Sequence, residues 1–237
     1  MSGRAVRQRL QSLELAGVTC LPKNQRHVGT QRSSSHGREQ VATSSDAHEQ
    51  LQILRDDVAQ CQKCPQLASS RTQTVFGAGS VSPRLCFLGE APGADEDASG
   101  IPFVGRAGKL LTKIIEACTL SREDVYILNV LKCRPPENRR PHPEEVDNCR
   151  SFFEQQLEIV RPEFICCLGA SAAHALLETT QSIGSLRKKW FEYKESRVIC
   201  TYHPSYLLRN PSAKRDVWED MKRLMAVSYT HLTLPTS

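Results

Sequence analysis

Residues 84–120 read RLCFLGEAPGADEDASGIPFVGRAGKLLTKIIEACTL, and this stretch decides the fold. It begins with RLCFLGE at residues 84–90, a short apolar run of the kind that forms a buried strand. A loop rich in glycine, proline and acidic residues follows. Residues 107–120 then place apolar side chains at helical spacing, from Leu110 to Ile115, as an amphipathic helix does. The stretch therefore predicts a strand, a loop and a helix in series.

The same alternation recurs along the rest of the chain. Further apolar runs that are typical of buried strands lie at residues 125–131, 164–169 and 197–203. Further segments with helical patterns lie at residues 143–160, 171–178 and 212–225. Strands that alternate with helices indicate a parallel sheet covered on both faces. We therefore predict an α/β fold, a three-layer α/β/α domain with a central, mainly parallel four-stranded sheet.

Composition divides the chain into three parts. Residues 1–48 are polar, with few large apolar side chains, and we expect a disordered N-terminal extension there. Residues 49–226 hold the predicted folded domain. Residues 227–236 read VSYTHLTLPT, the translation of a transposase adapter used in sequencing libraries, so we expect residues 227–237 not to be native. On this expectation the native C-terminus is missing.

Charge and apolar runs restrict the class of protein. The 237 residues carry a net charge of +5, a mild basic excess that is compatible with a polyanionic partner. The sequence has no apolar run near the roughly 18 residues of a membrane span, and its N-terminus lacks the apolar core of a signal peptide. We expect a monomeric cytoplasmic protein with no membrane partner.

Polar residues fall where the predicted strands end. Glu90 ends the first strand, Asn129 lies near the end of the second, Gly169 closes the third and His203 ends the fourth. Ligands of parallel sheets bind beyond the carboxyl ends of the strands. Asn129 by itself would fit a structural role beside neighbouring backbone, but the convergence of these residues predicts one binding cleft.

The segment HPSYLLRN at residues 203–210 predicts a second part of the site. Pro204 fixes the turn after the strand, and Ser205 is a suitable cap for a following helix. An apolar and basic tip then follows, which suits a wedge entering a nucleic-acid groove beside phosphates: Tyr206, Leu207, Leu208 and Arg209. The alternative for the two leucines is a plain hydrophobic anchor.

The ten cysteines are numerous for a reducing compartment. Cys61 and Cys64 form a CxxC pair, and Cys133 and Cys149 follow further along the chain. Four thiolates in two pairs indicate a metal site, and either zinc or a 4Fe–4S cluster satisfies that count. The cysteines inside predicted strands are expected to be core thiols: Cys86, Cys166, Cys167 and Cys200.

Three motifs and the four paired cysteines together resemble a known family. The motifs are GEAPGADEDASGIPFVGRAGKLL, LNVLKCRPPENRRPHPEE and HPSYLL, in this order within residues 51–225. They resemble the family-four uracil-DNA glycosylases, the iron-sulfur branch of that superfamily. The resemblance implies a 4Fe–4S cluster rather than zinc, with these ligands: Cys61, Cys64, Cys133 and Cys149.

The same resemblance implies an activity and a set of roles. The protein would flip uracil out of single- or double-stranded DNA, in the nucleoid of a bacterium or archaeon, and hydrolyse its N-glycosidic bond for base excision repair. Phe103 would stack on the base, Asn129 would bond its polar edge, and His203 would face O2. Backbone groups at Glu90, Ala91 and Gly93 would line the pocket. Glu90 is the candidate for positioning water, and its alternative role is to order the loop.

Charged residues near these motifs give weaker signals. We expect Asp95, Glu96 and Asp97 to form a solvated face, because acids do not help to bind DNA. Two basic clusters are candidates for phosphate contacts, with ordinary solubilising charge as the alternative: Lys132, Arg134, Arg139 and Arg140, and Arg187, Lys188 and Lys189.

Two other classes of function compete with the glycosylase interpretation. A non-catalytic nucleic-acid-binding module with zinc or an iron-sulfur cluster would use the cysteines and basic loops, but it would need neither Asn129 nor His203. An electron carrier built on the cluster would leave the cleft motifs without a purpose. Within the enzyme class, Ala91 is small and leaves open a broader base preference.

Overall fold

The computed structural model describes residues 44–230. The expected extension at residues 1–48 lies almost wholly outside the described residues, except that helix α2, Ser44–Ala59, begins five residues before the expected boundary at residue 49. Helix α10, Lys214–Thr230, continues through the first four residues of the segment that we expect not to be native. The remainder of that segment, residues 231–237, lies outside the described residues.

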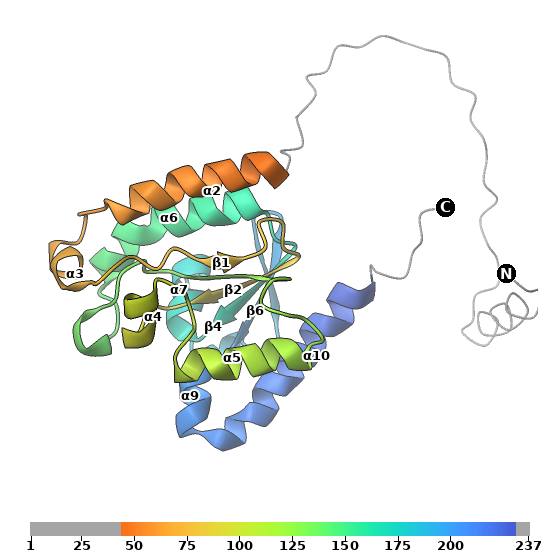
Figure 1. The fold of residues 1–237 in the computed structure, drawn as a ribbon. Helices are drawn as coiled ribbons and strands as arrows, with labels where there is room; N and C mark the ends of the chain where they lie inside the picture. The colour runs from red at the N-terminus through yellow and green to blue at the C-terminus, as the bar shows by residue number, and fades with distance from the viewer. Residues whose placement is uncertain (1–43, 231–237) are drawn as a thin grey trace, which may run out of the picture. The chain divides into compact units, whose positions relative to one another are not determined.

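A sheet forms the centre of the domain (Figure 1). It has six strands in the order β1-β3-β2-β4-β6-β5. Its strands are β1 Ala78–Gly79, β2 Leu85–Gly89, β3 Tyr126–Asn129, β4 Phe164–Leu168, β5 Trp190–Tyr193 and β6 Ser196–Thr201. The four inner strands pair in parallel, which confirms the predicted sheet. Both edge strands pair antiparallel and were missed, because β1 has two residues and β5 is only half-buried, so neither has a continuous apolar run.

The inner strands are buried on both faces, and their side chains alternate between two cores. On β2, Cys86 and Leu88 join the core under one helical layer, while Leu85 and Phe87 join the core under the other. This explains why the strands read as continuous apolar runs rather than as an alternating pattern. The four cysteines predicted to be core thiols are all buried on these strands.

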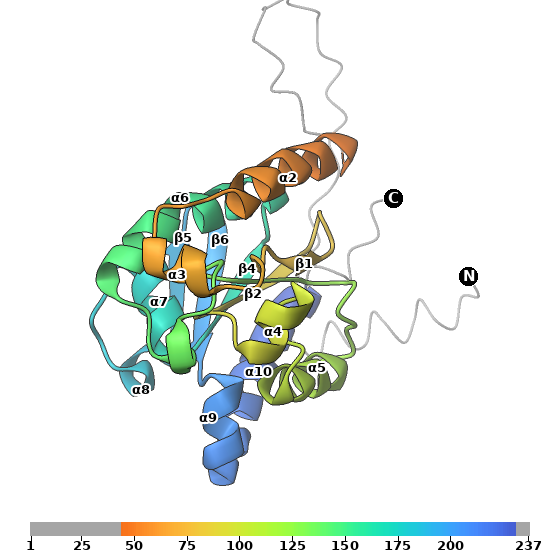
Figure 2. The same cartoon turned by 60° about the vertical axis from the view of Figure 1, so that its left-hand side comes forward.

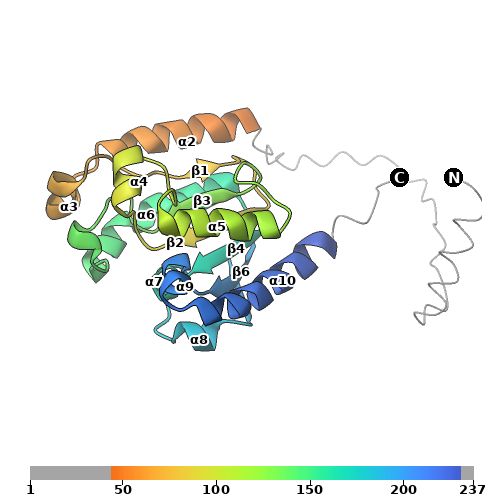
Figure 3. The same ribbon diagram turned by 60° about the horizontal axis from the view of Figure 1, so that its bottom comes forward.

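Helices cover both faces of the sheet, as Figures 1 and 3 show. The core of one face receives α2, α3 Pro65–Ser70, α6 Pro143–Val160, α7 Ala170–Leu177 and α8 Ile183–Leu186. The core of the other receives α5 Arg106–Ala117, α9 Pro204–Arg209 and α10. The short α4, Ala94–Ser99, lies in the loop between β2 and α5. No helix within residues 44–230 combines the length and the apolar character needed to cross a bilayer.

Helix α6 shows how closely local sequence can determine an element. Its bounds match the predicted range, because Pro143 occupies the first turn, where the missing N–H costs nothing. The carboxylate of Glu145 accepts the backbone N–H of His142 at 2.8 Å and closes a capping box. Arg139 pairs with the same carboxylate and lowers the pKa of Glu145.

Candidate active site and cysteine cavity

A cleft of about 700 Å³ opens at the carboxyl edge of the parallel strands. Helices α4, α7 and α9 contribute to its walls and lie around this edge in Figure 2. The structure brings most of the predicted site residues together in its lining: Glu90, Ala91, Gly93, Phe103, Asn129, His203 and Arg209. Tyr206, a residue of the predicted tip, also lines it, together with Tyr202, for which no role was expected.

Asn129 lies at the floor of the cleft, at the end of β3, with only 1% of its surface exposed. Its side-chain oxygen Oδ1 is buried and has no hydrogen-bond partner among the described residues. Gly89 is its register partner on β2, and a Cβ there would lie 2.3 Å from Oδ1 and 2.5 Å from the ring of Phe103. Only glycine leaves room for both side chains. The floor is thus a buried amide beside an aromatic ring.

The loop that carries Phe103 is fixed by two charged side chains. Phe103 has a left-handed φ of 55°, a strained conformation for an aromatic residue. Arg122 donates to the carbonyl oxygens of Pro102 at 2.7 Å and Phe103 at 3.1 Å. The Glu96 carboxylate accepts three backbone N–H groups, those of Gly93, Val104 and Gly105. These contacts hold the Phe103 ring, 5% exposed, in the cleft.

The expectation of a solvated acidic face was therefore wrong for two of its three residues. Glu96 ties the loop together, and Asp97 is buried and accepts the backbone N–H of Thr72 at 3.0 Å. Only Asp95 is exposed as expected. The signal that could have identified Glu96 is its position three residues after Gly93, as in a helix-capping box.

His203 directly precedes α9 and acts as its N-cap, a role that was expected of Ser205. Its Nδ1 accepts the backbone N–H of Ser205 at 3.1 Å and lies 2.7 Å from the Ser205 hydroxyl. Burial, with a smaller effect from Arg209, lowers the pKa of His203 to about 4. Since a backbone N–H can only donate, Nδ1 is an acceptor, and the neutral ring carries its proton on Nε2. His203 is therefore a neutral hydrogen-bond donor at its Nε2.

Close packing sets the position of the His203 side chain. Gly169, with a φ of +93°, lies opposite, and a Cβ there would come within 3.0 Å of the His203 Cβ. The Phe103 ring lies 5.6 Å from the imidazole, centroid to centroid. The Phe103 ring, the His203 ring and the Asn129 amide thus lie together in the lining of the cleft.

The tip after His203 differs from its prediction at one residue. Leu207 is 1% exposed and packs in the core with α5 and α10, so it anchors α9 instead of facing DNA. Leu208 is 39% exposed, and Arg209 is exposed and lines the cleft. Leu207 is therefore a hydrophobic anchor, the alternative given above. Leu208 and Arg209 remain candidates for a wedge that enters a nucleic-acid groove.

Two residues of the predicted basic clusters are also buried. Lys132 is 1% exposed and donates to the carbonyl oxygen of Asn129 at 2.7 Å, and burial lowers its pKa to about 7. Arg187 is 6% exposed and pairs with Asp220 at 2.7 Å. Both are structural, whereas Arg139 and Arg140 do line the cleft.

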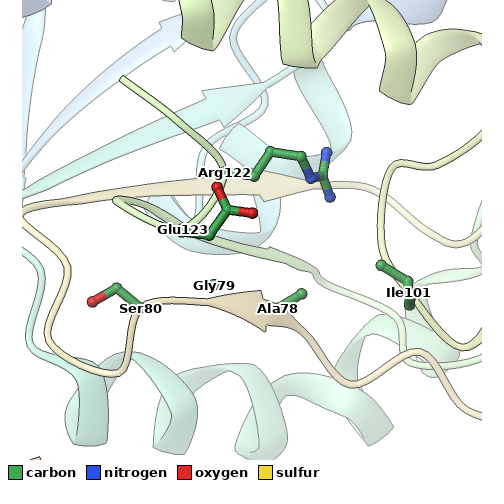
Figure 4. Close-up of a pocket in the computed structure, with 6 residues that line it drawn as sticks. All are labelled: Ala78, Gly79, Ser80, Ile101, Arg122 and Glu123. Carbon is green, nitrogen blue, oxygen red and sulfur yellow. The ribbon is translucent and has the colours of Figure 1, made fainter. Parts of the chain in front are cut away.

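A second cavity, of about 420 Å³, lies beside β1 (Figure 4). Its lining includes Ile101, Arg122 and Glu123. The guanidinium of Arg122 donates to the carbonyl oxygens of Pro102 and Phe103. This cavity therefore lies next to the side chain that holds the Phe103 loop. None of the predicted site residues lines it.

The four cysteines of the predicted cluster line one small cavity. They come from separate segments: Cys61 and Cys64 precede α3, Cys133 follows β3, and Cys149 lies in α6. Arg71 donates to the Cys133 sulfur at 3.1 Å. Asn148 lies 3.5 Å from the Cys64 sulfur and donates to it. Donors aimed at sulfur stabilise thiolates, the form that binds a metal.

The donor set in this cavity fits a metal centre with sulfur ligands. Within residues 44–230, no three His, Cys, Asp or Glu side chains are arranged to hold one metal ion. The four sulfurs nevertheless share one cavity, with Leu67 and two cationic side chains, Lys63 and Arg71, in its lining. Zinc and an iron-sulfur cluster both take thiolate ligands of this kind.

Comparisons with known proteins place the chain in a family. The family model described as the uracil DNA glycosylase superfamily matches residues 76–222. A type-4 uracil-DNA glycosylase of Archaeoglobus fulgidus is 43% identical over 185 residues, which cover 74% of this chain and 92% of that protein. One of Thermotoga maritima is 45% identical over 179 residues, covering 74% and 93%. A type-5 uracil-DNA glycosylase of Pyrobaculum aerophilum is 31% identical, covering 62% and 79%.

Proposed function

This chain belongs to the type-4 uracil-DNA glycosylases of the uracil-DNA glycosylase superfamily, and from that premise we propose that it hydrolyses the N-glycosidic bond of a uracil flipped into the cleft. The product is an abasic site in DNA, the substrate of later steps of base excision repair. One observation carries the assignment of the pocket: the buried Asn129 amide has an oxygen with no partner in the described chain.

Asn129 supplies the base specificity in this proposal. An amide offers one acceptor and two N–H donors, which match the N3–H and the O4 of uracil. Cytosine carries an amino group at position 4 and no hydrogen on N3, so it would leave the buried amide unpaired. A site that leaves buried polar groups unpaired rejects the wrong ligand strongly. Phe103 stacks on the base, since its ring lies beside the same amide.

His203 supplies the charge stabilisation. As the bond breaks, the sugar moves toward an oxocarbenium ion and the uracil leaves as an anion with charge on O2. The Nε2–H of the neutral His203 ring donates to that oxygen. A preorganised donor of this kind typically contributes about a hundredfold or more in rate. The contacts of Nδ1 with Ser205 support this role, because they fix both the ring and its tautomer.

The remaining groups act on water and on the DNA strand. Glu90 lines the cleft and is proposed to position the water that adds to the sugar. Arg139, Arg140 and Arg209 lie at the same cleft and would contact phosphates. Leu208 would fill the space left by the flipped base. The protein acts as a cytoplasmic monomer in this proposal.

We also propose that Cys61, Cys64, Cys133 and Cys149 hold a 4Fe–4S cluster. When bound, the cluster supplies a structural cross-link between the segments that carry its ligands. The shared cavity and the donors from Arg71 and Asn148 support this assignment. Lys132 precedes Cys133 and donates to the backbone carbonyl of Asn129. The loop that carries Cys133 therefore also supports the floor of the cleft.

Uracil release from a single-stranded oligonucleotide with one deoxyuridine tests the activity. We expect the full chain to release uracil and to leave a matched thymine strand intact. Asn129→Ala should lose at least about a hundredfold in rate while it unfolds at the wild-type temperature or above, because it removes an unpaired buried polar group.

Two outcomes would contradict the proposal. Binding of the strand without release by folded, iron-loaded protein would favour a non-catalytic nucleic-acid-binding module. Equal release by Asn129→Ala and wild type would leave the activity but remove Asn129 from the pocket.

Reduction chemistry tests the electron-carrier alternative, because a structural cluster should resist repeated reduction and oxidation.

A further inference from the structure

A pair of tyrosine rings stands at the cleft and has no role in the chemistry proposed above. Tyr202 follows β6, and Tyr206 lies in α9, one turn beyond His203. Their ring centroids are 4.9 Å apart and the planes are inclined by 31°. Both residues line the cleft. Tyr206 is nevertheless 38% exposed, so part of its surface stays accessible beside its packing partner.

An arginine side chain that is held by hydrogen bonds packs against this pair. The guanidinium of Arg187 lies 4.3 Å from the centroid of the Tyr202 ring. Arg187 itself is held by the Asp220 carboxylate at 2.7 Å and by the carbonyl oxygen of Asp216 at 2.7 Å. Asp220 also accepts the Thr201 hydroxyl, and neither Asp220 nor Thr201 is exposed. Helix α10 and strand β6 thereby fix the inner side of the stack.

The Tyr202 ring therefore contacts two groups, the Arg187 guanidinium and the Tyr206 ring. Beside this contact Tyr206 keeps 38% of its surface exposed. The result is an aromatic surface with a rigid base that is open toward solvent at the cleft.

We propose that Tyr206, supported by Tyr202, is a stacking platform for the nucleobase next to the flipped uracil in the same strand. Every base has an aromatic face, so a platform of this kind binds single strands with little sequence preference. Arg209, one residue from the exposed Leu208, provides positive charge for the phosphates of the same strand. The inference rests on the proposed function, because it places the uracil in the cleft beside His203.

The platform predicts an energetic coupling between one protein ring and one DNA base. The test measures the affinity for labelled single strands that carry 2′-fluorodeoxyuridine, whose fluorine slows bond cleavage. Three strands are compared: one intact, one with the 5′ neighbour of the uracil replaced by a stable abasic residue, and one with the 3′ neighbour replaced. Fluorescence anisotropy gives the dissociation constant for each.

We expect wild type to bind one of the two abasic strands about tenfold more weakly than the intact strand, the usual size of a base–aromatic stack. Tyr206→Ala should bind the intact strand about tenfold more weakly and lose nothing further with that abasic strand. Tyr206→Phe keeps the ring and should match wild type. Trp218→Ala removes an equally exposed aromatic residue on α10 that does not line the cleft, and it should also match wild type.

Two results would overturn the platform. Wild type could bind all three strands equally, or Tyr206→Ala could remain as sensitive to the missing base as wild type. Uracil release by wild type from the ordinary deoxyuridine strand is measured in parallel. Failure of that release would contradict the proposed function, whereas the binding cycle tests the platform independently of catalysis.

Discussion

One short loop connects the cleft with the cysteine cavity, but the two sites differ in the contacts that form them. Asn129 ends a strand and lies in the cleft, and Cys133, four residues later, lines the cavity. The cleft lies at the carboxyl ends of the strands. Its walls are held by backbone N–H groups that donate to Glu96, by Arg122, which donates to the Phe103 carbonyl, and by the Ser205 N–H, which donates to His203. The cavity gathers sulfur atoms from segments outside the sheet.

This difference separates groups that face a substrate from groups that hold a structure. The cleft is complete without its ligand, so variants there should change the rate more than the stability. The cavity gathers four thiols that burial alone does not stabilise as thiolates; burial raises the pKa of Cys149 to about 11. In the proposed function the bound cluster compensates for that cost, so variants there should change the stability first.

The largest effect is expected at the cavity. Cys133→Ser should lose most of its iron and destabilise the fold by on the order of 4 kcal/mol, since loss of a metal site belongs to the most damaging changes. Iron content and the temperature of unfolding measure both effects. Cys200→Ala is the control, because it removes a buried thiol outside the cavity and should keep its iron. Full iron content in Cys133→Ser would contradict the proposed difference between the cavity, which holds a structural group, and the cleft.

The next effect is expected at His203. His203→Asn should lower the rate of uracil release by about a hundredfold or more, because asparagine can cap α9 but cannot reach as far into the cleft. Its temperature of unfolding should stay near that of wild type. Single-turnover release and thermal melting measure the two quantities. A variant that loses stability as much as rate would show that His203 serves the fold rather than the reaction.

A moderate effect is expected where the floor of the cleft leaves no space. Gly89→Ala would force a methyl group against Asn129 and Phe103, at an expected cost of about 1 to 3 kcal/mol in stability together with a loss of activity. Gly184→Ala is the matched control, since a Cβ there meets only the Ser182 hydroxyl at 3.9 Å. Urea unfolding and uracil release compare the pair. Equal behaviour of the two variants would argue against a tight floor.

The smallest effect is a dependence on pH. The unfolded chain binds a proton at His203 as the pH falls through about 6.5, whereas the folded chain resists until about pH 4 because its pKa is lowered. Wild type should therefore lose stability between these values, and His203→Asn should lose less over the same range. Thermal melts at several pH values measure the difference. Identical slopes for both proteins would mean that the folded His203 keeps an ordinary pKa.

Much of the cleft could be predicted because strand ends are visible in a sequence. Glu90, Asn129 and His203 each follow an apolar run, and parallel strands bring such ends to one edge. The errors share another cause. Glu96, Leu207 and Lys132 were assigned from their residue types, but burial and hydrogen bonds with distant segments decide what each of them does.

The sequence by itself determined the alternation of strands and helices, the bounds of α6 and the cysteine pairs, because these follow from periodicity, capping and spacing within short segments. Tertiary structure alone decided which face of α9 is buried, which acids support the Phe103 loop, and that Tyr202 and Tyr206 stack at the cleft. The physical reason is range: propensity and spacing act between near neighbours, whereas burial and pairing depend on residues that folding brings from far along the chain.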